Sequence, residues 1–437
     1  LRAYEGSEEQ KNDLASLAEL KAIEDEQIER VLEMLQAAQR PVIYAGNGIR
    51  LAGAADQFLD VLNKVEVPVC TYWDCIDLIP TEHPLYVGRA GNMGERPGNF
   101  AVQNADLILA IGNRLSIRSL GYNWKAWARE AKVIMVDIDP AELRKPTLHV
   151  DLAICGDAGV FLNKLAEKVH ECGPVSAPQE WRRICADWKK DYPVVLERHR
   201  KDNSGFANAY AVFDAISRAL PERSVTVTSN GTCCVAGHQS WFIRKDCRFL
   251  NNNAVASMGY GLPAAIGACK ANEDKTVICL EGDGSIMMNL QELQTVVTNQ
   301  LPVKIFMINN QGYHSIRQTQ NNLFSEHCHV GIGPESGDLS FPDFHKIADA
   351  FGVPYYKIGN NGEADEVIEK CLKDEAGPVL CEIFVSTVQL FEPKNSASRK
   401  ADGSLYSAPL EDLAPFLPRE ELKKNLYITP LPGELEE

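Results

Sequence analysis

The stretch TVICLEGDGS, residues 276–285, decides the fold of this chain together with VKIFMINN, residues 303–310. Each is a short apolar run that ends in polar residues, which is the pattern of a buried parallel strand followed by a turn. Open α/β sheets bind their ligands at the carboxyl ends of such strands. The two stretches therefore predict an α/β fold and a binding site at one edge of its sheet.

Two oxygen-bearing side chains lie at these strand ends. Asp283 and Asn310 are 27 positions apart, and both are hard oxygen donors that Mg²⁺ accepts together with phosphate oxygens and water. Gly282 and Gly284 allow the backbone to approach a diphosphate, whose charge suits the amides that open the following helix. Each motif alone is common in turns and loops, and only their combination favours a site for a metal and a diphosphate.

This pair of motifs resembles the signature of thiamine-diphosphate enzymes. The resemblance implies that Asp283, Asn310 and the backbone carbonyl of Gly312 bind Mg²⁺. It also implies that the loop SNGT, residues 229–232, contacts the diphosphate. The residues expected to bind thiamine diphosphate are Asn230, Gly231, Thr232, Ala256, Met258, Gly282, Asp283, Gly284, Ser285, Asn310, Gly312 and Tyr313.

The segment ASMGYGLPAAIGA, residues 256–268, is similar to one in acetolactate synthases. There a bulky Met props the cofactor between its two rings, so the resemblance assigns this role to Met258. It assigns to the carbonyl of Ala256 the role of hydrogen-bond acceptor for the aminopyrimidine. The small residues of this segment also predict a helix packed tightly against a sheet, which is the purely structural interpretation.

His314 and Gln318 are the candidate catalytic residues, expected to contact a carboxylate or carbonyl of the substrate. A histidine beside a loop is more often a surface or capping group, so a structural role for His314 stays open. Acetolactate synthases often have Trp where this chain has Thr319, so their acceptor preference does not carry over.

The family's catalytic Glu belongs to a separate N-terminal domain, and nothing upstream of residue 28 matches that domain. The chain begins at Leu1 without Met, so we expect a fragment, or a partner chain that supplies the missing domain. We also expect this chain alone to bind the cofactor weakly and to show no turnover.

Apolar runs and helical stretches alternate along the chain and predict two doubly wound parallel-sheet domains of the α/β class. Proline-rich, polar segments separate and follow them. The expected division is a linker at 1–27, a central domain at 28–172, a linker at 173–205, a thiamine-diphosphate and Mg-binding domain at 206–388, and an extended C-terminal tail at 389–437.

The first domain resembles the central domain of acetolactate synthases in RPVIYAGNG, ADLILAIGNRL and VIMVDIDPAEL. Those enzymes bind a flavin dinucleotide there, with glycine turns at the pyrophosphate and acidic groups at the ribose. The matching residues are Gly46, Gly48, Gly112, Arg114, Asp137 and Asp157. The loop GRAGNMGERPGN from Gly88 departs from the usual flavin contact, so FAD, another nucleotide or no ligand stay open.

Composition excludes several classes of protein. The chain has 437 residues and a net charge of −16, with no dense basic cluster, so we expect no nucleic-acid partner. There is no apolar run of 18 residues and no signal peptide, so we expect no membrane span. Its 13 cysteines are scattered through apolar segments without zinc spacing, as in a reduced, cytoplasmic protein.

The resemblance implies a thiamine-diphosphate-dependent transferase or lyase that decarboxylates a 2-oxo acid, pyruvate above all, and joins the product to an acceptor carbonyl. The tail is similar to tails of relatives in sugar and surface-polysaccharide pathways, which suggests an acceptor other than pyruvate. An acyl-CoA lyase or a C–C hydrolase of the same superfamily is the alternative. Two more remote alternatives are a nicotinamide oxidoreductase and a non-catalytic relative of the family. The family's sites form between subunits, so a homodimer or homotetramer is expected.

Overall fold

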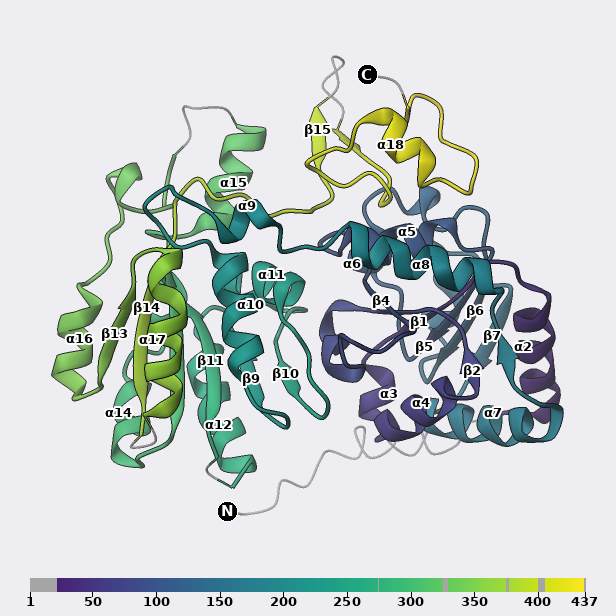
Figure 1. The fold of residues 1–437 in the computed structure, drawn as a ribbon, viewed down its shortest axis with the longest axis horizontal. Helices are drawn as coiled ribbons and strands as arrows, with labels where there is room; N and C mark the ends of the chain where they lie inside the picture. The colour runs from purple at the N-terminus through teal and green to yellow at the C-terminus, as the bar shows by residue number, and fades with distance from the viewer. Residues whose placement is uncertain (1–21, 274, 325–328, 375–376, 400–404, 436–437) are drawn as a thin grey trace.

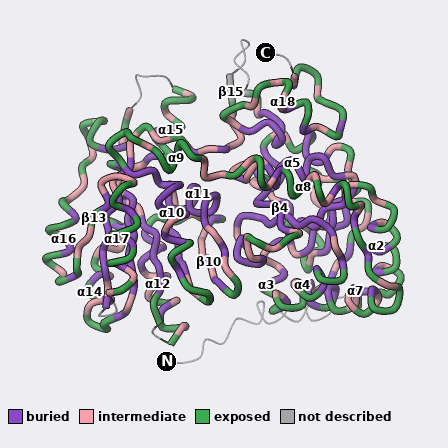
Figure 2. Tube along the Cα trace, viewed as in Figure 1, coloured by how far each residue is buried: buried purple, intermediate pink, exposed green. Residues whose placement is uncertain are grey.

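The computed structural model describes residues 22–273, 275–324, 329–374, 377–399 and 405–435. Two six-stranded parallel sheets form two α/β domains that lie side by side (Figure 1). Strands fill the interior of each domain, and the outer helices α2, α16 and α17 expose one face to solvent (Figure 2). The predicted fold class is confirmed.

The first sheet has the order β4-β3-β1-β5-β6-β7, with every neighbouring pair parallel. Its strands are β1 (Pro41–Ala45), β3 (Val69–Thr71), β4 (Tyr86–Arg89), β5 (Leu107–Ile111), β6 (Lys132–Asp137) and β7 (Leu152–Cys155). The helices around it are α2 (Asp25–Ala37), α3 (Gly48–Leu51), α4 (Ala55–Leu62), α5 (Arg96–Asn104), α6 (Ile117–Leu120) and α7 (Ala158–Cys172). A small separate pair joins β2 (Val65–Glu66) and β8 (Val175–Ser176).

The apolar runs in PVIYAGNG, VPVCTY, ADLILAIGN, AKVIMVDIDP and VDLAICGD predict five strands, and these are β1, β3, β5, β6 and β7. β1 and β5 are buried along their whole length, as expected for central strands with helices on both faces. The apolar spacing of IERVLEMLQAA, residues 28–38, predicts a helix, which is α2; its buried residues Ile28, Val31, Leu32 and Leu35 lie on one face. β4 was not predicted as a strand.

The second sheet has the order β10-β9-β11-β12-β14-β13 and is also parallel throughout. Its strands are β9 (Val225–Thr228), β10 (Arg248–Leu250), β11 (Val277–Gly282), β12 (Val303–Asn309), β13 (Tyr355–Ile358) and β14 (Val379–Phe384). The helices are α10 (Ala209–Ala219), α11 (Gly231–Ser240), α12 (Gly261–Ala271), α13 (Asp283–Ile286), α14 (Glu292–Thr298), α15 (His314–Leu323), α16 (Phe344–Phe351) and α17 (Asn361–Lys373). In the register of β11 and β12, Gly282 lies opposite Ile308, so the two motifs end side by side.

The segments predicted as linker and tail carry regular structure. α8 (Gln179–Asp191) lies within 173–205, and its Trp181 and Trp188 belong to the core of the first domain. α9 (Glu197–Arg200) follows. The C-terminal segment crosses from the second domain back over the first (Figure 1), with β15 (Ala397–Arg399), β16 (Leu405–Ser407) and α18 (Arg419–Lys424).

Arg89 and Asp77 join the two domains. The buried Arg89 donates to the backbone carbonyls of Gln239 (2.8 Å) and Trp241 (2.5 Å) beside α11. Asp77 binds Arg248 of β10 at 2.9 Å. Guanidinium groups satisfy carbonyls at a buried interface because each carries several donors in a fixed plane.

The described residues also bear on the predictions from composition. None of their helices has the length and apolar character needed to cross a membrane. The cysteines among them are free, and most are buried.

Candidate functional site

A cavity of about 140 Å³ lies at the carboxyl ends of β9, β11 and β12. It collects most of the residues predicted to bind the cofactor, although they come from four separate segments of the chain. Its lining consists of Asn230, Gly231, Thr232, Cys233, Met258, Gly282, Asp283, Gly284, Ser285, Ile308, Asn310, Gly312, Tyr313, His314, Ser315 and Ile316. Of the predicted residues, only Ala256 and Gln318 do not belong to this lining.

Asp283 is the buried carboxylate of the cavity. Its Oδ1 accepts from the backbone N–H of Gly284 (2.7 Å) and its Oδ2 from that of Gly312 (2.9 Å). Burial raises the pKa of Asp283 to about 7, against the opposing effect of these amides. No cationic side chain among the described residues forms an ion pair with it, so a bound cation would complete its environment.

Asn310 is oriented by Thr232. The side-chain nitrogen of Asn310 donates to Thr232 Oγ1 at 2.9 Å, and both residues are buried. This bond uses the nitrogen of the amide, so the oxygen is the atom left to ligate a metal. Because Thr232 lies in the first turn of α11, the same contact links the second motif to the loop after β9.

Two glycines leave open space where a diphosphate would approach. A Cβ atom built on Gly231, whose φ is +61°, or on Gly282 would meet no atom within 4 Å. Gly231 opens α11, a ten-residue helix whose first amides face outward from its end. Asn230, one residue earlier, donates from its side chain to the carbonyl of Ala256 (3.0 Å). The cavity therefore has the glycine cradle that this cofactor needs.

Ser285 and Glu281 form hydrogen bonds with the backbone of the segment that contains Met258. Ser285 Oγ lies 2.6 Å from Ser229 Oγ and accepts from the backbone N–H of Gly259 at 3.0 Å. Glu281 is fully buried, and its Oε1 accepts from the N–H of Leu262 at the start of α12. Both contacts hold the segment that carries Met258. Glu281 was not predicted, although an acidic residue that directly follows an apolar run is a recognisable signal.

Met258 lies at the edge of the cavity and is 40% exposed. It precedes α12, which begins at Gly261. Ala256 has a positive φ of 55°, a strained value for a residue with a Cβ atom, and the bond from Asn230 is made to its carbonyl. A carbonyl has a second lone pair, so this acceptor can still receive a ligand.

Gly312 and Gly284 pack where a side chain would not fit. A Cβ atom on Gly312 would come within 2.0 Å of the carbonyl oxygen of Ile332, and one on Gly284 within 2.3 Å of the ring of Tyr313. The carbonyl of Gly312, the predicted third metal ligand, accepts from the N–H of His314 at 3.1 Å. These two glycines bring the two motif loops into contact.

His314 lines the cavity but both of its ring nitrogens have partners. Arg317 Nη1 donates to Nδ1 (3.2 Å), so Nε2 carries the proton and donates to the carbonyl of Gln389. Burial lowers the pKa of His314 to about 4, with Arg317 and Lys394 acting in the same direction, and the ring is neutral at pH 7. Gln318 contacts this ring and accepts from Lys394 Nζ (2.9 Å).

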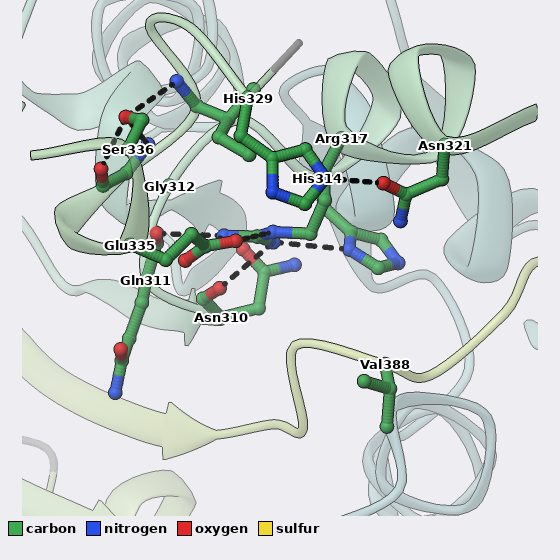
Figure 3. Close-up of polar contacts among 12 residues, drawn as sticks. Asn310, Gln311, Gly312, His314, Arg317, Asn321, His329, Glu335, Ser336 and Val388 are labelled. Atoms are coloured by element: carbon green, nitrogen blue, oxygen red, sulfur yellow. Dashed lines mark hydrogen bonds and ion pairs between the residues drawn. The ribbon is translucent and has the colours of Figure 1, made fainter. Parts of the chain in front are cut away.

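Arg317 holds the second motif in place. Its guanidinium donates to the carbonyls of Asn310 (3.3 Å) and Gln311 (3.0 Å) and pairs with Glu335, as the dashed lines in Figure 3 show. Arg317 itself is buried. Neither member of this pair was predicted, because Glu335 lies 18 residues further along in a short 3₁₀ turn without a recognisable motif.

We expect the Arg317→Gln variant to be destabilised by about 2 kcal/mol, because it leaves buried carbonyls without donors. We also expect its affinity for thiamine diphosphate with Mg²⁺ to fall by roughly tenfold, since the Asn310 loop loses its anchor. Urea denaturation and calorimetry would measure the two effects. Arg183→Gln is the control, because Arg183 pairs with Asp187 on the exposed face of α8. Equal behaviour of the two variants would contradict the role given to Arg317.

A second cavity, of about 380 Å³, lies at the carboxyl ends of β1, β5 and β6 in the first domain. Gly48, Gly112, Arg114, Asp137 and Asp157, five of the six residues matched to a flavin site, line it. The sixth, Gly46, supports it from behind: a Cβ atom there would lie 2.2 Å from the carbonyl oxygen of Gly112.

Two of the matched residues in this second cavity have local partners, whereas Asp74 Oδ1 and the side-chain nitrogen of Asn113 in its lining are buried without a hydrogen-bond partner among the described residues. Asp157 accepts from the amides of Gly159 and Val160 at the start of α7, and Arg114 pairs with Glu142 at 3.0 Å. Burial raises the pKa of Asp137. The structure therefore brings the six residues together, and the identity of a ligand stays a prediction.

Comparison with known proteins identifies the family to which both domains belong. Residues 28–165 match the family model of the thiamine pyrophosphate enzyme central domain, and residues 229–383 match that of the C-terminal TPP binding domain. The isozyme 2 acetolactate synthase large subunit of Escherichia coli K12 is 31% identical over 83% of this chain and 63% of its own length. The acetolactate synthase large subunit of Cyanidium caldarium is 32% identical over 83% of this chain and 60% of its own length.

Proposed function

Because this chain belongs to the thiamine pyrophosphate enzyme family, we propose that it binds thiamine diphosphate and Mg²⁺ in the cavity at the ends of β9, β11 and β12. We propose further that it takes part in decarboxylation of a 2-oxo acid, pyruvate above all, and transfer of the product to an acceptor carbonyl. The chain spans about 63% of the length of the Escherichia coli isozyme 2 subunit, so the activity of the whole protein is part of this proposal.

One observation carries the proposal: Asp283 and Asn310, 27 positions apart, line one cavity together with an open glycine cradle. Among the described residues no group of three or more His, Cys, Asp and Glu side chains could hold a metal. A site with a single carboxylate suits Mg²⁺ that is bound partly by phosphate oxygens, because this ion rarely occupies an all-protein cage.

The residues present fit this cofactor. Asp283, the amide oxygen of Asn310 and the carbonyl of Gly312 would hold the metal. Gly231, Thr232 and the first amides of α11 would hold the diphosphate, whose charge suits a helix N-terminus. When bound, thiamine diphosphate supplies a carbon nucleophile and an electron sink for the loss of carbon dioxide from the 2-oxo acid.

The chain's own residues orient the reactants and exclude water. Met258, Tyr313 and Ile316 give the cavity an apolar wall. His314 remains neutral at pH 7 and cannot hold a substrate carboxylate by charge, so its predicted role is limited to a hydrogen bond and to shape. Gln318 would reach substrate only after it releases Lys394, and its catalytic role stays a prediction.

We propose that a second polypeptide surface covers the cavity. Large apolar side chains are exposed near its residues, namely Val255, Met258, Met287, Met288 and Ile316. Exposed apolar groups gathered around a binding site are typical of a protein interface. A homodimer or homotetramer, or a partner chain, would cover them, and native mass spectrometry would identify which.

The cavity of the first domain is proposed as a nucleotide site, for FAD or for another nucleotide. Gly48 and Gly112 approach each other so closely that only glycine fits, which leaves room beside the strand ends. An absorbance band near that of free flavin in the purified protein would identify FAD, and mass spectrometry of the released ligand would identify another nucleotide.

Binding of thiamine diphosphate is expected to require Mg²⁺. With excess EDTA, the affinity should fall by roughly hundredfold or more, because the buried carboxylate then repels the diphosphate instead of sharing a cation with it. Calorimetry with and without Mg²⁺ measures this. Thiamine monophosphate, which lacks the second phosphate, is the control ligand. Tight binding in EDTA would contradict the metal site.

Product analysis tests the reaction. The protein, assembled with the partner surface proposed to cover the cavity, is incubated with Mg²⁺, thiamine diphosphate and pyruvate, with and without a set of aldehydes, and the products are separated. The chain without that partner is the control and is expected to show no turnover. A carboligation product supports the proposal and identifies the acceptor. Cleavage of an acyl-CoA or hydrolysis of a C–C bond without carboligation would favour the alternative of a lyase or hydrolase from the same superfamily.

A further inference from the structure

A third cavity, of about 240 Å³, lies between the two domains. It is bordered by β4 and the start of α5 from the first domain, by α8 and α9 of the connecting segment, and by α10 and α11 of the second. α11 lies on the side of the second domain that faces the first (Figure 1). Arg89 and Glu95 belong to the loop GRAGNMGERPGN, which departs from the usual flavin contact, and this cavity shares no lining residue with either predicted cofactor site.

The charge of this cavity is opposite to that of the chain. The whole protein carries −16, but the titratable groups that line the cavity are four cations and two carboxylates, a surplus of two positive charges. They are Arg89, Lys189, Arg200, Arg218, Glu95 and Asp214. Cations gathered in a cleft attract anions even when the rest of the protein repels them.

The surplus of positive charge in this cavity comes from Arg200, Arg218 and Lys189. Asp214 is a single carboxylate shared by Arg200 (2.7 Å) and Arg218 (2.9 Å), so one of the two guanidinium charges is not balanced. Lys189 forms no ion pair with a carboxylate in the described part of the chain. Its Nζ donates to the backbone carbonyl of Thr81 at 2.6 Å.

Two features indicate that Lys189 and Arg89 retain charge or donor capacity that the protein does not fully use. Burial lowers the pKa of Lys189 to about 8, with Arg89 acting in the same direction and the carboxylates of Glu95 and Glu82 acting against it. Arg89 is 6% exposed and pairs with Glu95, but its Nε has no hydrogen-bond partner in the part of the chain that the structure describes.

We propose that the cavity between the domains is a binding site for a small metabolite that carries a phosphate group. A phosphate monoester brings close to two negative charges and several acceptor oxygens, which matches the surplus. Guanidinium groups bind such oxygens through paired N–H donors. The aromatic side chains of Trp241 and Phe242 and the aliphatic Val194 would contact the carbon part of the ligand.

Calorimetry on the full chain tests this site, with thiamine diphosphate and Mg²⁺ at saturation so that the cofactor cavity is occupied. The saturation matters because α11 borders both cavities, and phosphate could otherwise bind at the diphosphate cradle. The probes are inorganic phosphate and glycerol 3-phosphate. Succinate, a dianion of another geometry, is the third ligand. We expect one saturable site for each phosphate probe and weaker binding of succinate.

Two variants locate the binding. Lys189→Met and Arg218→Gln are each expected to weaken phosphate binding by roughly tenfold, since each loses a charged donor. Lys190→Met and Arg223→Gln are the matched controls, because Lys190 is the exposed neighbour of Lys189 on α8 and Arg223 is 82% exposed. Arg218 is half exposed, so its variant folds even if Lys189→Met does not.

The proposal is overturned if no saturable phosphate binding occurs in the saturated protein, or if Arg218→Gln binds phosphate as tightly as Arg223→Gln. Binding of succinate as tight as that of both phosphates would also overturn it, because the ligand class would then be any dianion.

Discussion

The Asp283→Asn variant is expected to bind thiamine diphosphate with Mg²⁺ at least roughly hundredfold more weakly than the unchanged chain. Asparagine keeps the size of the side chain and one oxygen acceptor, but it removes the negative charge that holds the metal. Loss of an outer partner of a metal ligand already costs about 10- to 100-fold in affinity, so loss of the ligand's charge costs more. Calorimetry at saturating Mg²⁺ gives the two dissociation constants.

The same substitution separates binding from folding. In the absence of cofactor, Asp283 is a buried carboxylate whose pKa burial raises to about 7. Replacing it with a neutral amide removes that desolvation cost, so the melting temperature of the cofactor-free variant should not fall by more than a few degrees. Asp365→Asn, on the exposed face of α17, is the control for affinity. Binding of normal strength by Asp283→Asn would refute the metal site.

The sheet strands were predictable because long parallel sheets require apolar runs. Runs such as LILAI and VKIFMI are buried along the strands, as expected for the middle of a parallel sheet covered on both faces by helices. β4 escaped prediction for the same reason: its four residues include Gly88 and Arg89, and Arg89 is buried only because the second domain offers it carbonyls. The sequence around Arg89 does not indicate that its hydrogen-bond acceptor, the carbonyl of Gln239, lies 150 residues away.

In the candidate site, too, some residues were predictable from the sequence and others were not. Residues that follow strand ends, such as Asp283 and Asn310, were brought together by topology alone, and the sequence places them at those ends. The residues that support the site were not predictable. Arg317 donates to the carbonyl of Gln311 and pairs with Glu335, and no sequence motif indicates that these segments lie next to each other. Residues 173–205 were predicted as a linker because prolines lie among polar and charged residues there, with a helical pattern around Trp181 and Trp188. That helix is α8, and the two tryptophans bury its inner face in the first core.

The Gly312→Ala variant is expected to lose more than about 3 kcal/mol of unfolding free energy in the second domain, together with cofactor affinity. Gly312 has a φ of +125°, and a Cβ atom there would lie 2.0 Å from the backbone oxygen of Ile332. Backbone atoms cannot swing aside as a flexible side chain can. The amide of Gly312 donates to Asp283 at 2.9 Å, so any shift that relieves the contact also disturbs the carboxylate of the metal site.

Gly337→Ala separates the two causes of this loss. Gly337 also has a positive φ, +74°, but a Cβ atom there would meet nothing within 4 Å. Its alanine variant therefore carries only the cost of the left-handed backbone, about 1–2 kcal/mol, and should bind thiamine diphosphate normally. Urea denaturation of both variants, with calorimetry, gives the comparison. Equal unfolding free energies for Gly312→Ala and Gly337→Ala would contradict this prediction. The close contact between residues 311–313 and residues 332–333 would then not be needed to hold the second motif against the first.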